Sequence, residues 1–271
     1  MTDTKTTACL YEVADGVATL TWNRPERNNA WNADLERAYF DALERARDDD
    51  DVRVIIITGA GKMFSPGADT NVLQGIEGPG GDGGVTRRPQ TFPLSIPKPL
   101  IAAINGSCAG ISFCQTLMCD LRFAAAGAKF TTAFVRRGLV AEHGSSWLLP
   151  RLIGQARALD LLVSGRVFLA EEAEQLGVVN KVVPKESLLD EVLTYAKDLA
   201  ANCSPRSMAS IKAQVYGDLE STLDDAMRRA NKLMSRSFGY PDFKEGVQSF
   251  VERRAPVFEP VPSDYEPIPT S

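Results

Sequence analysis

The chain has 271 residues, of which 44% are hydrophobic and 24% charged, and its formal net charge is −5. This composition is typical of an ordinary globular protein and allows one large domain or a core with a smaller appendage. The negative charge and the scattered arginines argue against a nucleic-acid partner. No apolar run approaches the ~20 residues that span a bilayer, and the polar start at residues 1–7 lacks the apolar core of a signal peptide. We therefore expect a cytoplasmic protein without a membrane partner.

The cysteines and the histidine exclude some kinds of site. The five cysteines are odd in number and form no C-x-x-C pair, which predicts reduced core residues. They are Cys9, Cys108, Cys114, Cys119 and Cys203. His143 is the single histidine, so a zinc site built on several histidines is excluded.

The first elements in chain order are a hairpin and a helix. Residues 10–13 and 17–22 are strand-like and flank Asp15-Gly16, a strong signal for a type I′ turn. After a polar loop, Asn32 can cap a helix from Ala33 to about Arg47 with one apolar face.

Two buried strands then end in glycine-marked turns. Residues 52–57 and 100–105 are short apolar runs, typical of strands covered on both faces. The first leads into the glycine-rich stretch at 57–69, and the second into the turn at 106–110 and a small apolar helix. Free N–H groups at such strand ends suit a developing negative charge, and we expect the Ala68 N–H to form one arm of an oxyanion hole. The alternative is that the glycines only permit close packing.

A long loop lies beside the first turn. Residues 74–93 contain many glycines and paired arginines and show no periodicity. The loop is either a lid over a site or a surface insertion without a role.

In the rest of the chain, predicted strands and helices give way to a region that is mainly helical. Short strands are expected at 120–125 and 129–132, then a helix that ends near Ile153. Helical spacing follows at 155–163, 170–176, 186–201, 205–217, 221–236 and 242–253, with an extended piece at 178–183. The proline-rich tail at 255–262 cannot be helical. The pattern predicts an α/β core over residues 1–200 and a C-terminal helical region over residues 201–271.

Six stretches together carry a family resemblance. They are residues 23–30, 64–69, 98–106, 118–124, 149–154 and 243–250. In this order they resemble the enoyl-CoA hydratase/isomerase superfamily, the crotonases. The resemblance implies the ClpP/crotonase fold, a spiral of repeated β-β-α units with a C-terminal α-helical trimerisation region. It also implies a homotrimer or a hexamer (a dimer of trimers) and an acyl-CoA thioester substrate. No metal and no separate cofactor is implied, because coenzyme A is part of the substrate.

The resemblance also implies roles for individual residues. The N–H groups of Ala68 and Ile111, the latter next to Gly110, would hold the thioester oxygen, and losing one such donor typically costs ~3–4 kcal/mol in the transition state. Relatives usually place a glycine where this chain has Ile111, so we expect the donor to remain in a tighter pocket. The remaining substrate-binding positions are Arg27 and Ala30 at the coenzyme A adenine and phosphates, and Asp69, Thr70, Asn71, Phe134 and Leu139 along the pocket wall.

The chain departs from the family where hydratases carry two glutamates that activate water. By alignment these positions are Cys114 and Phe134, which can neither hold water nor carry its proton. Glu142 stands eight residues before Pro150, where several double-bond isomerases of the superfamily place a single acidic base. The resemblance therefore favours an isomerase with Glu142 as acid/base over an efficient hydratase.

Several alternatives stay open at this stage. Glu142 could instead only interact with the dipole of the following helix. A slow hydratase that uses Glu142 alone is a second hypothesis, and a non-catalytic acyl-CoA-binding oligomer is a third. His143 is interpreted as a structural hydrogen-bonding residue, with tuning of Glu142 or hydrolytic C–C bond cleavage as alternatives. Cys114 is disfavoured as a nucleophile because no visible partner would lower its pKa.

Overall fold

The core of the fold is a six-stranded sheet. The computed structural model describes residues 7–75, 88–262 and 265–267. The strand order is β1-β2-β3-β4-β6-β9, and all neighbours are parallel except the antiparallel β1–β2 pair. The strands are β1 (Cys9–Ala14), β2 (Val17–Trp22), β3 (Val54–Gly59), β4 (Leu100–Ile104), β6 (Leu121–Ala125) and β9 (Lys181–Val183). A second, three-stranded sheet consists of β5 (Cys108–Ala109), β7 (Lys129–Thr131) and β8 (Phe168–Leu169), in the order β5-β7-β8.

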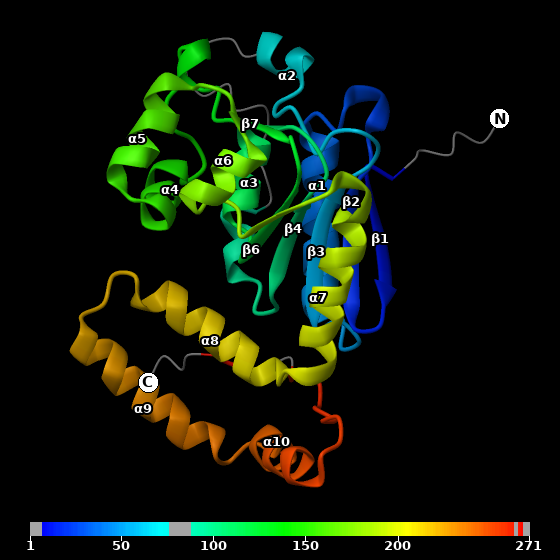
Figure 1. Cartoon of the computed structure of the whole chain (residues 1–271), viewed down its shortest axis with the longest axis vertical. Coiled ribbons are helices and arrows are strands. Elements are labelled where there is room, and N and C mark those ends of the chain that lie inside the picture. Colours follow the sequence, from blue (N-terminus) through cyan, green and yellow to red (C-terminus); the bar gives the residue numbers. More distant parts are fainter. Residues whose placement is uncertain (1–6, 76–87, 263–264, 268–271) are drawn as a thin grey trace, which may run out of the picture.

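Helices cover both faces of the larger sheet. In Figure 1, α7 lies across one face and α1 lies behind the strands. The helices are α1 (Ala33–Asp48), α2 (Thr70–Gln74), α3 (Ile111–Leu117), α4 (Ser145–Ile153), α5 (Gln155–Ser164), α6 (Ala170–Leu176), α7 (Leu188–Asn202), α8 (Pro205–Asp218), α9 (Leu223–Ser237) and α10 (Pro241–Glu252). Short 3-10 turns lie at Pro25–Arg27, Phe92–Ser95, Val135–Arg137 and Lys185–Ser187.

The strand β3 shows why the apolar runs form buried strands. Successive side chains point to opposite faces, so Ile55 and Ile57 join the cluster that includes α1, while Val54 and Ile56 join the cluster beneath α7. Every residue of β3 is buried, as the sequence predicts.

The hairpin and the cap of α1 also confirm the sequence analysis. Asp15 and Gly16 both have positive φ, at 51° and 76°, as a type I′ turn requires. The side chain of Asn32 accepts a hydrogen bond from the Leu35 N–H and caps α1.

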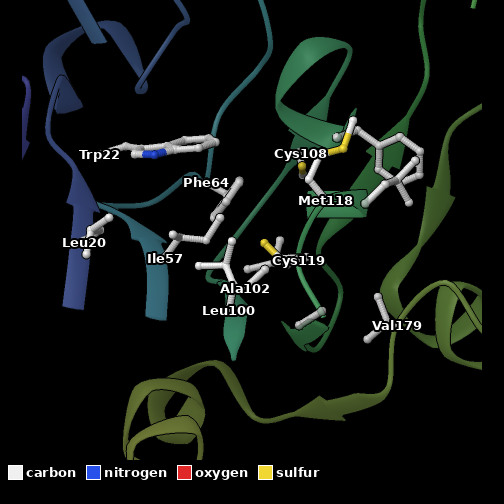
Figure 2. Close-up of a cluster of buried hydrophobic side chains, with 14 of the residues drawn as sticks. Leu20, Trp22, Ile57, Phe64, Leu100, Ala102, Cys108, Met118, Cys119 and Val179 are labelled. Atoms are coloured by element: carbon white, nitrogen blue, oxygen red, sulfur yellow. The ribbon is translucent and has the colours of Figure 1, made fainter. Parts of the chain in front are cut away.

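Figure 2 shows part of the larger hydrophobic cluster, which extends from Trp22 of β2 and Ile57 of β3 to Val179. The ring centroids of Trp22 and Phe64 are 4.6 Å apart, and both side chains are fully buried. Cys108 and Met118 belong to the same cluster. The core therefore fixes the two glycine-marked turns, since Phe64 lies in one turn and Cys108 in the other.

The C-terminal helices α8, α9 and α10 form a layer of their own, below the sheets in Figure 1. Arg206 of α8 and Asp242 of α10 form a buried ion pair within this layer. Its surface carries several exposed apolar side chains: Leu223, Met227, Met234, Phe238, Phe250 and Val251. The predicted helices in this region are confirmed, whereas the domain boundary at residue 200 and the role in trimerisation stay predictions.

The sequence does not predict some of the short elements. The turn at 106–110 contains β5, and β8 and α2 were not expected, because two to five residues are too few to show a period. The extended piece at 178–183 forms a strand only over Lys181–Val183. Of the proposed lid, residues 76–87 lie outside the described residues. The described end of this loop is anchored by Arg88, which forms ion pairs with Asp41 and Glu44 of α1.

Candidate active site

The two glycine-marked turns lie in backbone contact. Ser65 donates its N–H to the Ser107 oxygen at 3.0 Å, and the Ala109 N–H donates to the Ser65 oxygen at 3.1 Å. At Gly67, with φ 95°, a Cβ atom would stand 2.8 Å from the Ala109 carbonyl oxygen. Only glycine therefore allows the turns to approach so closely.

This contact brings two free N–H groups together. The neighbours of Ala68 pair with Trp31: the Gly67 oxygen accepts from the Trp31 N–H, and the Asp69 N–H donates to the Trp31 oxygen, both at 2.8 Å. The Ala68 N–H is left out of this ladder, and Ile111 is the first residue of α3, where an N–H has no partner within the helix. Within the described part of the chain, no acceptor takes either N–H.

Buried hydroxyl groups hold the same two turns. The Oγ atoms of Ser65 and Ser112 are 2.5 Å apart, and the Gly67 N–H donates to Ser65 Oγ at 3.3 Å. Both serines are fully buried. Backbone and hydroxyl contacts thus help to set the positions of the free N–H groups.

A cavity of about 1000 Å³ opens in front of these donors. The predicted site residues that line it are Arg27, Ala30, Ala68, Asp69, Thr70, Gly110, Ile111, Phe134, Leu139 and Glu142. Asn71 is the one predicted residue outside this lining, and its backbone N–H donates to the Asp69 carboxylate at 3.2 Å.

Glu142 and His143 lie in the irregular segment before α4. Backbone φ values of 51° at His143 and 74° at Gly144 turn the chain into the helix, and the Glu142 carbonyl accepts from Ser145 at 2.9 Å (N–H) and 2.7 Å (Oγ). His143 Nε2 lies 3.3 Å from Glu142 Oε2. Burial lowers the pKa of His143 below 6.5, and the charges of Glu142 and Glu36 only partly offset this. A neutral imidazole can donate this hydrogen bond near pH 7.

Cys114 and Phe134, the positions at which the resemblance implies glutamates in hydratases, carry no acid. Cys114 is fully buried, and burial raises its thiol pKa to about 12, so it is not a thiolate. Phe134 is only 6% exposed and presents an apolar wall to the cavity. All five cysteines are free, as the sequence predicts, and four of them are buried.

Asp69 fixes the chain directly after Ala68. Its carboxylate caps α2 and lies 3.3 Å from both the Arg24 and the Arg27 guanidinium groups. Burial alone would raise the pKa of Asp69, but the Asn71 N–H and the two arginines outweigh it and hold the pKa below its usual value. Arg24 also donates to the Ala30 carbonyl oxygen, so these residues form one charged cluster at the cavity.

Sequence reasoning missed Arg24 and Glu36. Arg24 stands in the family-like stretch 23–30, so that motif could have pointed to it. Glu36 follows the buried Leu35 on α1 and lines the cavity, yet the helical pattern gives no sign of this position.

The described residues offer neither a metal-binding cluster nor a membrane-spanning helix. In residues 7–75, 88–262 and 265–267, no group of three or more His, Cys, Asp or Glu side chains is placed to hold a metal ion. Over the same residues, no helix has the length and apolar character to cross a membrane.

Comparison with known proteins places the chain in a family. The family model described as enoyl-CoA hydratase/isomerase matches residues 12–260. The 1,2-epoxyphenylacetyl-CoA isomerase of Escherichia coli (strain K12) is 36% identical, over 92% of this chain and 97% of the relative. Among solved structures, an enoyl-CoA hydratase from Mycobacterium marinum is 52% identical, with a TM-score of 0.69 over 79% of this chain and 98% of that chain. An enoyl-CoA hydratase from Polaromonas sp. JS666 is 30% identical, with a TM-score of 0.87 over 93% and 99%.

These neighbours confirm the crotonase fold, a mixed α/β core with a C-terminal helical region. The chain is an acyl-CoA-processing member of the enoyl-CoA hydratase/isomerase family.

Proposed function

We propose that this enzyme moves the double bond of an enoyl-CoA thioester, with Glu142 as acid/base and the N–H groups of Ala68 and Ile111 as the oxyanion hole. The observation that carries the proposal is the content of the cavity: two free backbone donors and the Glu142 carboxylate, with Cys114 and Phe134 at the positions of the two hydratase glutamates.

The chemistry requires only these groups. Glu142 takes a proton from C2 of a 3-enoyl thioester, and the negative charge spreads to the thioester oxygen. The two N–H groups stabilise that charge, and donors fixed in advance need no reorganisation during the reaction. Glu142 then returns the proton to C4 and leaves a 2-enoyl thioester. The apolar side chains of Phe134 and Leu139 keep bulk water away from the proton in transit.

Arg27 and the Asp69 cluster lie where the nucleotide part of coenzyme A would bind. Arg27 keeps a half-exposed guanidinium while it pairs with Asp69, so it can also meet a phosphate. No separate cofactor enters this reaction, and that absence stays a prediction.

Hydration is the second candidate, because the Mycobacterium marinum relative and several others carry the name enoyl-CoA hydratase. Water addition needs a group that activates water and a group that protonates C2. Glu142 would have to serve both steps, so we expect hydration to be slow in comparison with isomerisation.

Deuterium exchange tests the proposal. The protein in D2O is incubated with 3-hexenoyl-CoA and, separately, with 2-hexenoyl-CoA, and NMR follows the C2 and C4 protons. We expect double-bond migration and exchange in the wild type and neither in Glu142→Gln. Formation of 3-hydroxyacyl-CoA without migration would establish the hydratase instead, and binding of both esters without any reaction would establish a non-catalytic binder.

The exposed apolar residues of α9 and α10 support self-association as a homotrimer, or as a hexamer made of two trimers. Light scattering of the wild type and of Phe250→Glu tests this assignment. Because Phe250 is 84% exposed, the new charge should leave the fold of the single chain intact and weaken only a contact between subunits. A monomeric wild type would contradict it. The cytoplasmic location also stays a prediction.

A further inference from the structure

Glu36 is a cavity carboxylate that the proposed reaction does not use. It lies on α1, is half-buried, and lines the same cavity as Glu142 and His143. Its charge opposes the effect of burial on the His143 pKa, so it lies on the His143 side of the cavity. An acyl group that reaches past Glu142 would meet it.

Hydrogen bonds fix the direction in which this carboxylate faces. Oε2 of Glu36 accepts from Trp31 Nε1 at 3.0 Å and from Gln90 Nε2 at 2.6 Å. The Gln115 amide donates to both oxygens of Gln90, at 3.2 Å (backbone) and 2.9 Å (side chain). Because Gln115 occupies the oxygen end of the Gln90 amide, the nitrogen end must point to Glu36. The arrangement holds the carboxylate before any ligand arrives.

The carboxylate has no cationic partner among the described residues, and no donor in that part of the chain contacts its Oε1 atom. Two other acids at the cavity, Asp69 and Asp41, differ in this respect. Asp69 pairs with Arg24 and Arg27, and Asp41 pairs with Arg88. A half-buried carboxylate that is held by neutral donors on one oxygen keeps unused acceptor capacity on the other.

The surroundings of Glu36 indicate what could use this capacity. Trp31, Phe40 and Ile111 also line the cavity and give it apolar surface, although polar side chains such as Gln90 and Arg88 line it too. A ligand group that fits has an apolar body and one neutral hydrogen-bond donor. A plain hydrocarbon would displace water from Glu36 without replacing its hydrogen bond, which is unfavourable.

We propose that Glu36 determines substrate specificity by accepting a hydrogen bond from a hydroxyl group on the acyl part of the substrate. The enzyme then prefers hydroxylated acyl-CoA esters to plain hydrocarbon ones. The inference rests on the proposed function only in that the acyl group occupies this cavity, and it does not depend on the isomerase step. Sites that are built to hydrogen-bond a substrate hydroxyl discriminate strongly against analogues that lack it.

Calorimetric binding of saturated esters tests the inference, because these esters cannot isomerise. The panel is hexanoyl-CoA, its 4-, 5- and 6-hydroxy derivatives, and 6-aminohexanoyl-CoA. The wild type should bind at least one hydroxy ester about 10- to 100-fold more tightly than hexanoyl-CoA. Equal binding of hexanoyl-CoA and all three hydroxy esters, or tightest binding of the amino ester, would overturn the proposal.

Substitutions assign the preference to Glu36. Glu36→Leu should abolish it, and Glu36→Gln, which keeps the volume and one acceptor oxygen, should reduce it several-fold. Asp34→Asn is the matched control, since Asp34 lies on the same helix, is exposed, and does not line the cavity. A preference that survives in both Glu36 variants would overturn the proposal, and Glu36→Gln decides alone if Glu36→Leu does not fold.

The two proposals fail separately. If Glu142→Gln retained isomerisation but the hydroxy preference vanished in the Glu36 variants, the assignment of the base would be wrong and the specificity site would stand. If hexanoyl-CoA and its hydroxy derivatives bound equally well while Glu142→Gln was inactive, the specificity site would be wrong and the assignment of Glu142 as the base would stand.

Discussion

The two walls of the cavity are built in different ways. The backbone wall consists of the Ala68 and Ile111 N–H groups and is fixed by the close approach at Gly67 and by the serine pair beneath it. The side-chain wall consists of Glu142 and His143, which lie in an irregular segment. Donors on the backbone do not depend on side-chain identity, whereas the other wall changes its chemistry with each side chain. Substitutions in the backbone wall and in the side-chain wall should therefore have different effects on the reaction.

The largest effect is expected from Glu142→Gln, which removes the proton carrier and leaves the backbone wall intact. We expect kcat to fall about 10³-fold, while KM changes little because the lost interaction is made in the transition state. Steady-state kinetics with a 3-enoyl-CoA measure this. A residual kcat above about a tenth of the wild-type value would contradict the role of Glu142 as the catalytic base.

Gly67→Ala attacks the backbone wall. The added Cβ would stand 2.8 Å from the Ala109 oxygen, so the two turns must move apart and kcat should fall about 10²-fold. Gly61→Ala is the matched control: Gly61 also has positive φ, at 76°, but the nearest atom to its Cβ is Pro25 Cβ at 3.5 Å. Both variants should lose stability, but only Gly67→Ala should lose kcat. Equal kcat in the two would contradict this account of the donors.

Substitution of His143 should lower kcat less, because His143 acts only by holding the Glu142 carboxylate in position. We expect His143→Leu to lower kcat about 10-fold and His143→Gln, whose amide can still donate, to lower it less. Equal losses in the two variants would argue against a hydrogen-bonding role.

His143 also links stability to pH. Burial places its folded pKa below the usual 6.5, so the unfolded chain binds more protons in the window between these two values. The free energy of unfolding should therefore fall as the pH drops from about 6.5 through the folded pKa, and this part of the decrease should disappear in His143→Gln. Urea unfolding at several pH values and an NMR titration of the single imidazole measure it. A folded pKa above 6.5 would reverse the sign.

The smallest effect is expected at the edge of the backbone wall. Arg27→Ala should raise KM for the acyl-CoA ester only several-fold and leave kcat unchanged, because Arg27 is 45% exposed and Arg24 still holds Asp69. The same kinetic assay at two salt concentrations checks this, since the KM of the wild type should rise with salt more than that of the variant. A lower kcat would show that Arg27 positions Ala68.

The sequence predicts the backbone wall well because its signals are local. The buried run at 52–57, the glycines after it and the cap Asn32 each point to one conformation, and the structure confirms the strand, the turns and the helix. The family resemblance predicts a site position for Glu142 from its spacing to Pro150, and Glu142 lines the cavity.

The rest of the site depends on contacts that no local pattern contains. Glu36, Gln90 and Gln115 are far apart in the chain, and their hydrogen bonds arise only when α1, the loop end and α3 pack together. These hydrogen bonds between distant residues therefore depend on tertiary packing, which the periodicity of the sequence does not predict. Asn71 lies in the short helix α2, which the sequence pattern does not reveal, and it is not among the residues that line the cavity.

The free N–H groups at Ala68 and Ile111 have a consequence for how such an enzyme can evolve. In the proposed mechanism the thioester is activated by main-chain N–H groups, so substitutions of side chains elsewhere in the cavity leave these donors in place. In the same mechanism, substitutions at Phe134 and Glu142, which both line the cavity, would change which reaction follows from the same activated ester.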